Sequence, residues 1–453
     1  MVEYCVTEFE YWEEEMKERV VLLLIIASLW VFLFIFQNYM PTFWALVFLC
    51  SFMFVYAIYM QIAFKHQKRK LRKKPKEINY EYKPFVTIMI PSHNEQYVIE
   101  KTVETVLELD YPNFEVIVID DRSEDETGKV IKALEAKYEK VIAMIRPKDA
   151  FPGKSAVLND AMALAKGEAI LVFDSDARVD KDFLTKLVPA LEPKDVGAVQ
   201  ARKIISNAGF NFLTQCQNNE YALDTHFQVG RDAVKGAVEL RGNGELLKRV
   251  ALEDIGGWNN YTITDDLDMS TRMQIKGWDV RFCPDVKVYE EGITKFLPLL
   301  RQRRRWVEGS IRRYLENFTD VLFSKNMSLR VSLDMTAYIT EIIMPVWMMS
   351  EICFQAFRVI KGYENNILSS LVVLFSIGVC FWLVTSYSIR KYNKQPAFRS
   401  VVQAVGTSAY LIVVWFPLAM FIVYKIIFMK KTMNWGKTAH GVAVSQTDNV
   451  VSI

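Results

Sequence analysis

The stretch Ala169-Ile170-Leu171-Val172-Phe173-Asp174-Ser175-Asp176 decides which fold we expect for this chain. Five apolar residues in a row, ending in polar ones, are typical of a buried strand in a parallel sheet. Open α/β sheets bind their ligands at the carboxyl ends of such strands. Asp174 and Asp176 would suit a hard divalent cation there, because such ions prefer carboxylate oxygens and share phosphate oxygens. A strand end followed by a helix-capping aspartate explains the tripeptide equally well.

Strand and helix patterns alternate around this stretch, from Phe85 to about Tyr289. We expect strands at 85–90, 114–119, 141–145 and 169–173, with helices between them at 95–109, 124–137 and 154–165. This spacing is typical of right-handed βαβ units. It predicts a Rossmann-like α/β domain with a mainly parallel sheet.

Long apolar segments lie on both sides of this domain. Hydrophobic residues make up 51% of the 453 and are bunched, which predicts membrane spans at 20–36, 42–64, 331–350, 367–388 and 401–427. A run rich in lysine and arginine, 65–76, follows the second span, so the positive-inside rule places the α/β domain in the cytoplasm. We therefore expect a multi-pass integral protein of the plasma membrane. The basic run is expected to contact anionic lipid head groups rather than nucleic acid.

These patterns divide the chain along its length. The parts are a cytosolic N-terminal segment (1–19), a transmembrane hairpin (20–64), a basic juxtamembrane linker (65–83), the α/β domain (84–295), amphipathic interfacial helices (296–328), about three transmembrane helices (329–429) and a C-terminal tail (430–453). Counting spans puts the C-terminus outside, but Lys430 and Lys431 speak against this, so the orientation of the last span stays open. Cys216 and Cys283 have no metal-binding spacing, which indicates free thiols in a reducing compartment and no zinc site.

Several charged residues fall in or near the predicted membrane segments. Arg301, Arg303 and Arg304 are expected to contact the membrane surface from an amphipathic helix. Asp334 and Glu341 lie within the third span, where ionisable groups usually face protein or water. For Asp334, a span that begins later in the sequence is an equally good explanation.

Polar motifs follow the ends of the predicted strands. Pro91-Ser92-His93-Asn94-Glu95 follows the first, Asp120-Asp121-Arg122-Ser123 follows the second, and Gly153-Lys154-Ser155 opens the third helix. Ser92 or Asn94 as a helix cap explains the first motif equally well. A carboxylate at 121 can accept hydrogen bonds from a nucleobase or from ribose hydroxyls. A lysine at a helix N-terminus can meet a diphosphate.

Three more polar motifs lie further along the chain. Arg241-Gly242-Asn243-Gly244 predicts a flexible turn before a helix that begins near Glu245. The stretch 262–268 adds three carboxylates, and 301–306 combines an amide, several guanidinium groups and an indole.

In this order the motifs resemble those of the membrane-integrated, inverting family-2 glycosyltransferases, which include cellulose, hyaluronan, chitin and poly-N-acetylglucosamine synthases. Asp121 lies in a D-D-x-S-x-D stretch, and Asp174-Ser175-Asp176 matches the D-x-D motif. Thr264-Asp265-Asp266 is similar to the T-E-D motif, with Asp265 where the family usually has glutamate, and Gln302…Arg305-Trp306 matches Q-x-x-R-W. The resemblance covers residues 84–315, and the flanking spans agree with it in placement.

The resemblance implies a GT-A fold, a nucleotide-diphosphate sugar donor, most often UDP-linked, and Mg²⁺ or Mn²⁺. The residues that it implies for binding the donor nucleotide are Pro91, His93, Glu95, Asp121, Lys154, Asp174, Ser175 and Asp176, of which Asp174 and Asp176 hold the metal. It implies Asp266 as the general base, and Asp265, Gln302, Arg305 and Trp306 at the acceptor and diphosphate end. Since Asp266 is retained, the departure at Asp265 bears on specificity rather than on activity.

The interpretation that we favour at this point is a processive enzyme that extends a β-linked polysaccharide and passes it through its own spans. The alternative of the same fold is a glycolipid synthase that transfers one sugar to a membrane lipid. A third hypothesis, from a different class of protein, is a transporter with a regulatory nucleotide-binding domain. It does not explain the carboxylates, which a transporter would not need. The expected partners are the sugar donor, a growing glycan or lipid acceptor, and membrane lipids.

Overall fold

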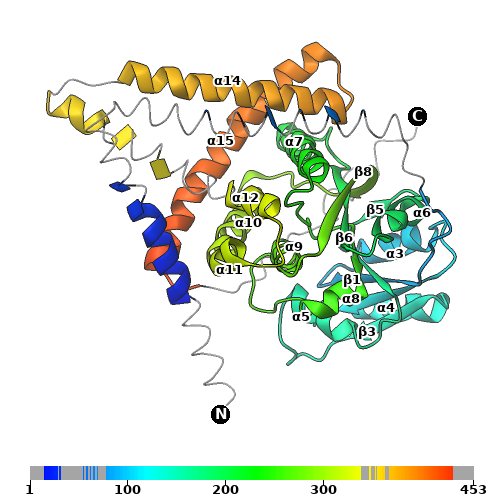
Figure 1. Cartoon of the computed structure of the whole chain (residues 1–453). Coiled ribbons are helices and arrows are strands. Elements are labelled where there is room, and N and C mark those ends of the chain that lie inside the picture. Colours follow the sequence, from blue (N-terminus) through cyan, green and yellow to red (C-terminus); the bar gives the residue numbers. More distant parts are fainter. Residues whose placement is uncertain are drawn as a thin grey trace.

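An eight-stranded sheet forms the centre of the computed structural model of this chain (Figure 1). The structure describes residues 15–28, 30–31, 78–337, 346–347, 352–353, 355–362 and 367–431, with scattered positions between 51 and 69. In chain order the strands are β1 (Val86–Ser92), β2 (Phe114–Asp120), β3 (Val141–Ile145), β4 (Ala169–Val172), β5 (Arg178–Val179), β6 (Val196–Ile205), β7 (Glu245–Lys248) and β8 (Asp279–Glu290). Their order in the sheet is β3-β2-β1-β4-β7-β6-β8-β5.

The sheet is mixed: four of its strand pairings are parallel, including that of β6 with β8, and three are antiparallel, which refines the expectation of a mainly parallel sheet. The four predicted strands, β1 to β4, are present and pair in parallel. β7 then runs antiparallel between β4 and β6, and β5 runs antiparallel to β8. The helix predicted near Glu245 is wrong, because its residues fill the gap between two strands, and burial there overrides the helix propensity of Glu-Leu-Leu-Lys. The helix begins only at α8 (Arg249–Asp254).

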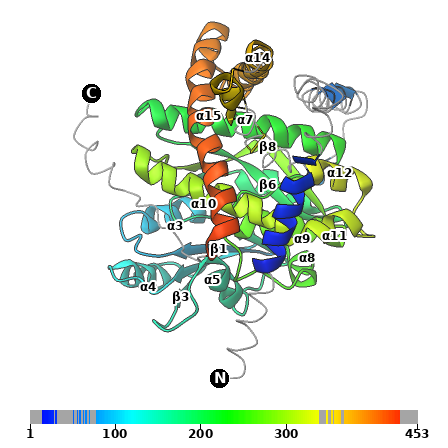
Figure 2. The ribbon, with the colours of Figure 1, turned by 90° about the vertical axis from the view of Figure 1, so that its left-hand side faces the viewer.

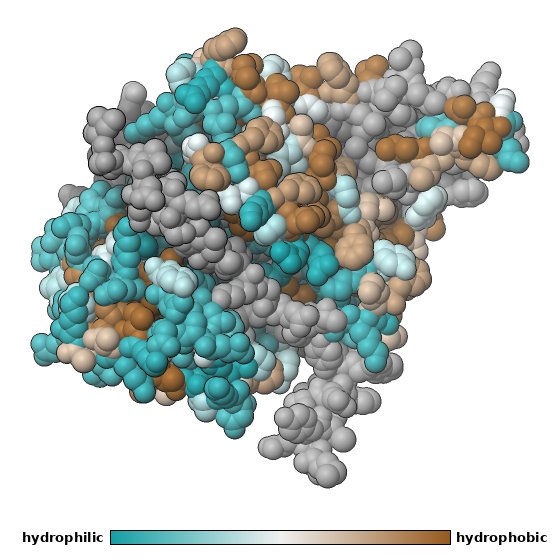
Figure 3. All heavy atoms as spheres, turned by 180° about the vertical axis from the view of Figure 1, so that it is seen from behind, coloured by the Kyte–Doolittle hydropathy of each residue, from teal (hydrophilic) through white to brown (hydrophobic). Residues whose placement is uncertain are grey.

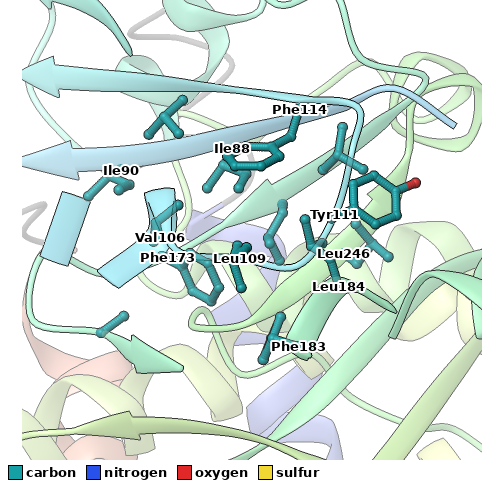
Figure 4. Close-up of a cluster of buried hydrophobic side chains, with 14 of the residues drawn as sticks. Ile88, Ile90, Val106, Leu109, Tyr111, Phe114, Phe173, Phe183, Leu184 and Leu246 are labelled. Carbon is teal, nitrogen blue, oxygen red and sulfur yellow. The ribbon is translucent and has the colours of Figure 1, made fainter. Parts of the chain in front are cut away.

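Helices cover both faces of the sheet, because successive strand residues point to opposite sides. Ile88 and Ile90 of β1 pack with α3 (Ile99–Leu107), α4 (Thr127–Lys137) and α6 (Phe183–Leu187). Met89 points the other way, towards α5 (Lys154–Ala161), α8 and α9 (Asp265–Lys276). Figure 4 shows the first of these cores, in which the rings of Phe173 and Phe183 meet at a centroid distance of 5.3 Å.

A helical layer lies beside this domain. Its members are α7 (Phe212–Val234), α10 (Phe296–Glu316), α11 (Phe318–Phe323), α12 (Leu329–Ala337), α14 (Ile367–Tyr392) and α15 (Ala397–Phe428). Of the described residues, one helix, α15, is long and apolar enough to cross a membrane. That one helix does not confirm the spans expected on both sides of the domain. The predicted span at 20–36 is described in part, as helix at 20–28 and 30–31, whereas most of 42–64 and Glu341 lie outside the described residues.

α15 crosses over α7 and α10 and is hydrogen-bonded to both of these helices (Figure 2). Near its start, Asn219 Nδ2 donates to Thr407 Oγ1 at 3.0 Å. Near its end, Lys425 Nζ donates to both carboxylate oxygens of Glu308, at 2.7 and 2.8 Å. Apolar residues gather where α14 and α15 lie, whereas the α/β domain is mainly hydrophilic on the face that Figure 3 shows.

A buried ion network joins the two ends of the described chain. Lys431, just past α15, lies 2.8 Å from Glu316 at the end of α10 and 3.5 Å from Glu18. Arg312 of α10 also pairs with Glu18, in the helix at residues 15–28. The chain before the first predicted span and the chain after α15 therefore both pack on α10.

Two charged residues in or near the predicted membrane segments face protein, as was expected for Asp334 but not for Arg303. Arg303 is fully buried, and its Nη2 donates to Glu220 at 2.8 Å, because α10 packs on α7 at this point. The predicted membrane contact of Arg303 is therefore wrong, whereas Arg301 and Arg304 are exposed. Asp334 is buried too, with Oδ2 accepting from the backbone N–H of Ala237 at 2.7 Å.

Candidate active site

A partly buried lysine, whose side chain is 14% exposed, stands at the carboxyl edge of the sheet. Lys154 opens α5, and its ammonium donates to Asp174 Oδ1 at 2.7 Å and to the Gly242 carbonyl at 2.8 Å. Burial lowers its pKa, but neighbouring carboxylates, Asp174 first and then Asp265, more than offset this, so that the pKa lies above its ordinary value. The ammonium is therefore charged at neutral pH and ties the end of β4 to the loop before β7.

Two adjacent aspartates face this lysine from α9. Asp265 and Asp266 are the first residues of the helix, where the helix dipole favours negative charge. Asp266 Oδ1 accepts from the backbone N–H of Leu267 at 2.8 Å. Burial, and then the neighbouring Asp265, raise the pKa of Asp266 to about 6. A carboxylate of this kind is suited to take a proton from a hydroxyl group near neutral pH.

Glu245 is a further acidic group of this cluster. It opens β7 and is fully buried; its Oε2 accepts from the Gly242 N–H at 3.3 Å. Its Oε1, like Asp265 Oδ2, has no hydrogen-bond partner in the part of the chain that the structure describes. Burial raises the pKa of Glu245 well above its ordinary value; Lys154 opposes this shift, and the aspartates of α9 add to it. The neutral carboxylic acid is thereby favoured, which keeps one negative charge out of the cluster.

The ends of β1 and β2 form the neighbouring part of the edge. Asp121 is fully buried, and its Oδ1 accepts from Arg146 at 2.5 Å and from Arg122 at 2.9 Å. His93 Nδ1 lies 2.6 Å from the Asp121 carbonyl oxygen. The Asp121 carboxylate thus binds two guanidinium groups, Arg122 from its own motif and Arg146, which no motif indicated. Two other residues predicted for this edge also lie here: Pro91 within β1 and Glu95 in the loop before α3.

Asp174, Ser175 and Asp176 follow β4 as the sequence predicted. The side chain of Asp174 is 39% exposed, whereas Asp176 is buried and its Oδ2 accepts from the Glu291 N–H at 2.9 Å. Among the described residues, no group of three or more His, Cys, Asp or Glu side chains is arranged to hold a metal ion. Carboxylate oxygens fit Mg²⁺ or Mn²⁺, but such an ion would need further ligands from a bound phosphate group.

Helix α10 closes the other end of the edge. The Trp306 ring centroid is 3.9 Å from the Arg303 guanidinium and 5.6 Å from the Lys203 ammonium. Lys203 of β6 pairs in turn with Glu290, the last residue of β8, at 2.9 Å. Gln302 and Arg305 lie on the same helix, and Gln302 Oε1 accepts from Arg303 at 2.7 Å. This end presents an aromatic ring among polar groups.

Close packing of α10 on α9 sets the distance between the two ends. Gly309 of α10 lies against Thr264, the residue before Asp265. A Cβ at Gly309 would be 2.3 Å from Thr264 Cγ2 and 2.4 Å from its Oγ1, so only glycine fits. Trp306 lies one turn before Gly309, which makes its position relative to the two aspartates depend on this contact.

Comparison with known proteins shows what kind of enzyme such a site belongs to. Residues 84–309 match the family model described as Glycosyltransferase like family 2. A β-monoglucosyldiacylglycerol synthase from Trichormus variabilis is 36% identical over 360 residues, which cover 79% of this chain and 76% of the relative. A poly-β-1,6-N-acetyl-D-glucosamine synthase from Staphylococcus epidermidis is 26% identical over 301 residues, which cover 66% and 70%.

The chain belongs to glycosyltransferase family 2. The family predicted from the motifs is therefore confirmed, and with it an enzymatic function. A solved mannosyltransferase from Pyrobaculum calidifontis, in complex with GDP-Man and Mn²⁺, shares the GT-A fold with a TM-score of 0.56 at 20% identity, over 81% of this chain and 98% of that one. The hypothesis of a transporter with a regulatory domain loses its basis, because the domain itself is that of a transferase.

Four residues of the candidate site lie outside the sequence motifs: Arg146, Lys203, Glu245 and Glu290. All four border strands: Arg146 follows β3, Lys203 and Glu290 lie near the ends of β6 and β8, and Glu245 opens β7. Because β7 is antiparallel to β4, its first residue reaches the same edge as the ends of the parallel strands. The sequence signal that could have indicated these four residues is a charged residue next to the apolar run of a strand.

If Asp266 is the base, the glycosyltransferase should lose activity in acid. The base must be ionised, so kcat is expected to fall as the pH drops through about 6. Asp265→Asn removes the charge that helps to raise this pKa, and the acidic limb of the kcat profile should then move to lower pH. Glu253→Gln, at an exposed acid on α8, is the control and should leave the profile in place. An acidic limb that Asp265→Asn does not move would contradict this electrostatic coupling.

Gly309→Ala should separate α10 from α9 and disturb catalysis. We expect kcat to fall by roughly tenfold or more, since displacements of about 1 Å can cost that much, while nucleotide affinity is kept. Thr264→Gly in the same chain removes the atoms that the new Cβ meets and should restore much of the rate. Gly378→Ala is the matched control, because a Cβ at that helical glycine of α14 meets nothing within 4 Å. Full kcat in Gly309→Ala would show that the contact does not position Trp306.

Proposed function

We propose that this chain is a membrane-bound, inverting glycosyltransferase that transfers one sugar from a nucleotide-diphosphate donor to a membrane lipid. The observation that carries this proposal is the identity of its relatives. Those at 34–36% identity, each over 79–80% of this chain, are β-monoglucosyldiacylglycerol synthases. Poly-N-acetylglucosamine synthases match at 26%. The relatives thus support the glycolipid interpretation better than the polysaccharide one, with a UDP-linked glucosyl donor and a diacylglycerol hydroxyl as acceptor.

We assign donor binding to the carboxyl edge of the sheet. A nucleoside at the ends of β1 and β2 would lie beside Asp121 and its two arginines, and a diphosphate beside the charged Lys154. Asp174 and Asp176 would hold Mg²⁺ or Mn²⁺ together with diphosphate oxygens, which fits an accessible carboxylate without further protein ligands. When bound, the ion offsets the charge on the leaving diphosphate. The Mn²⁺ and GDP-Man in the Pyrobaculum enzyme are consistent with this assignment.

We assign proton transfer to Asp266. Its carboxylate takes the proton of the acceptor hydroxyl as the hydroxyl oxygen bonds to the anomeric carbon and the bond to the diphosphate breaks. Attack from the face opposite the diphosphate inverts the centre, which agrees with the β-configuration in the name of the relatives. Asp265, Gln302, Arg305 and Trp306 form the acceptor end, where the indole can pack on a sugar ring or a lipid head group.

The membrane arrangement is part of the proposal. We infer a multi-pass protein of the cell membrane whose catalytic domain is cytoplasmic. It is supported by the length and apolar composition of α15 and by exposed apolar residues on the helical layer, among them Phe375 and Phe398. The basic run at 65–76 supports the cytoplasmic side for the domain.

Product mass tests the proposed function directly. The purified protein in nanodiscs that contain diacylglycerol is incubated with UDP-glucose, UDP-galactose, UDP-N-acetylglucosamine or GDP-mannose. We expect a lipid that carries one hexose, with release of the nucleotide diphosphate, and loss of product in excess chelator that Mg²⁺ or Mn²⁺ restores. A ladder of longer glycans would instead establish the polysaccharide interpretation, and full activity in chelator would remove the metal from the account.

A further inference from the structure

Two phenylalanines at the start of α7 stand out from the catalytic domain. The loop Ser206–Asn211, called here the Phe210 loop, joins β6 to α7. Phe210 is 55% exposed, and Phe212, the first residue of α7, is 59% exposed. The transfer reaction uses neither ring. Large apolar side chains displayed together in this way mark a surface that another apolar phase covers.

The Phe210 loop is held firmly to the domain. Asn207 Nδ2 donates to the Gly292 carbonyl at 2.9 Å, and the Gly292 N–H donates back to Asn207 Oδ1 at 2.8 Å. Asn211 Nδ2 donates to the Thr294 carbonyl at 2.8 Å, and its Oδ1 caps α7 by accepting from the backbone N–H of Thr214. The rings are therefore presented by a well-bonded loop.

The Phe212 ring continues the outer face of α15. A Cβ at Gly406 of that helix would be 2.8 Å from Phe212 Cε2, so the ring lies directly against α15 there. Val402, Val405 and Val413 are exposed on α15 on either side of this contact. Since α15 has the length and composition of a membrane helix, the Phe212 ring and this stripe form one surface of the kind that lipid chains cover, and Phe210 is exposed two residues before Phe212.

The Phe210 loop also begins at the acceptor end of the active site. The Ser206 N–H donates to the Glu290 carbonyl at 2.9 Å, while the Glu290 side chain pairs with Lys203 at 2.9 Å. Lys203 in turn lies 5.6 Å from the Trp306 ring centroid. Glu290 therefore contacts both the base of the loop and the Lys203–Trp306 end.

We propose that Phe210 and Phe212 insert into the lipid bilayer beside α15, and that the Phe210 loop is the rim over which the head group of the acceptor lipid reaches Trp306. The partner is the boundary between acyl chains and head groups, where aromatic rings are favoured. Such a rim lets the acceptor hydroxyl enter the site while its acyl chains stay in the bilayer. The route rests on the proposed lipid acceptor; the insertion of the rings does not.

Quenching by brominated lipid tests the insertion. Phe210→Trp is compared with the wild-type protein, whose ten tryptophans give the background. In phosphatidylcholine–phosphatidylglycerol vesicles, the added tryptophan should be blue-shifted and quenched by lipids brominated near the glycerol. Val250→Trp is the control, on the distant α8 and 56% exposed. Phe212→Trp gives a second reporter if the first variant folds poorly. Quenching no greater than in the control overturns the proposal. The proposal also fails if the new tryptophan is already shielded from water in detergent because a second copy of the chain covers it.

A separate measurement tests the route. In Phe210→Ser/Phe212→Ser, the KM for an acceptor lipid in bilayers should rise by roughly an order of magnitude while UDP affinity stays at the wild-type value. An unchanged KM with a lower kcat overturns the route and shows a role of the loop in chemistry. If brominated lipid quenches the fluorescence of the introduced tryptophan but the product is a polymer, the insertion is supported. The route and the proposed lipid acceptor are then both wrong.

Discussion

The rest of the site depends on the attraction between the Lys154 ammonium and the carboxylates around it. Asp174, Glu245 and the aspartates of α9 lie around one ammonium group, and burial makes uncompensated negative charge costly. The structure meets this cost in two ways: the ammonium stays charged, and the raised pKa of Glu245 favours its neutral form. The mixed sheet makes the arrangement possible, because the antiparallel β7 brings its first residue to the edge where the parallel strands end. The strand order of the sheet therefore determines which charged groups meet at the site.

Helix α10 joins that site to the surface that we place at the membrane. One side of the helix carries Trp306 and seats Gly309 on the residue before the two aspartates. Glu308, the residue before Gly309, is bonded to Lys425 of α15, and Arg312 pairs with Glu18 in the helix at residues 15–28. Displacing the apolar helices would therefore displace the acceptor end of the active site. In this account the membrane is part of how the enzyme positions its acceptor, and a lipid is the acceptor that such an arrangement favours.

Much of this could be predicted from the sequence, and the failures have physical causes. The first four strands follow from apolar runs, and the edge residues follow because parallel strands end together. β7 was predicted as a helix because Glu245-Leu246-Leu247-Lys248 is locally helix-favouring, and only its neighbours in the sheet decide otherwise. Arg303 looked like a membrane contact because a charge run does not reveal which side of α10 meets Glu220. The sequence left the choice between a polymer and a glycolipid open, because synthases of both kinds share these motifs and differ in the acceptor.

We propose that Lys154 and Asp174 hold the donor, while Asp266 takes the proton. Calorimetric titration of UDP in the presence of Mg²⁺, together with the turnover of Asp266→Asn, tests it most directly. The account predicts that turnover falls by roughly two to four orders of magnitude, as expected for the loss of a positioned base, while UDP affinity remains close to that of the wild type. A parallel collapse of UDP affinity and turnover would contradict it and would place Asp266 among the groups that hold the donor.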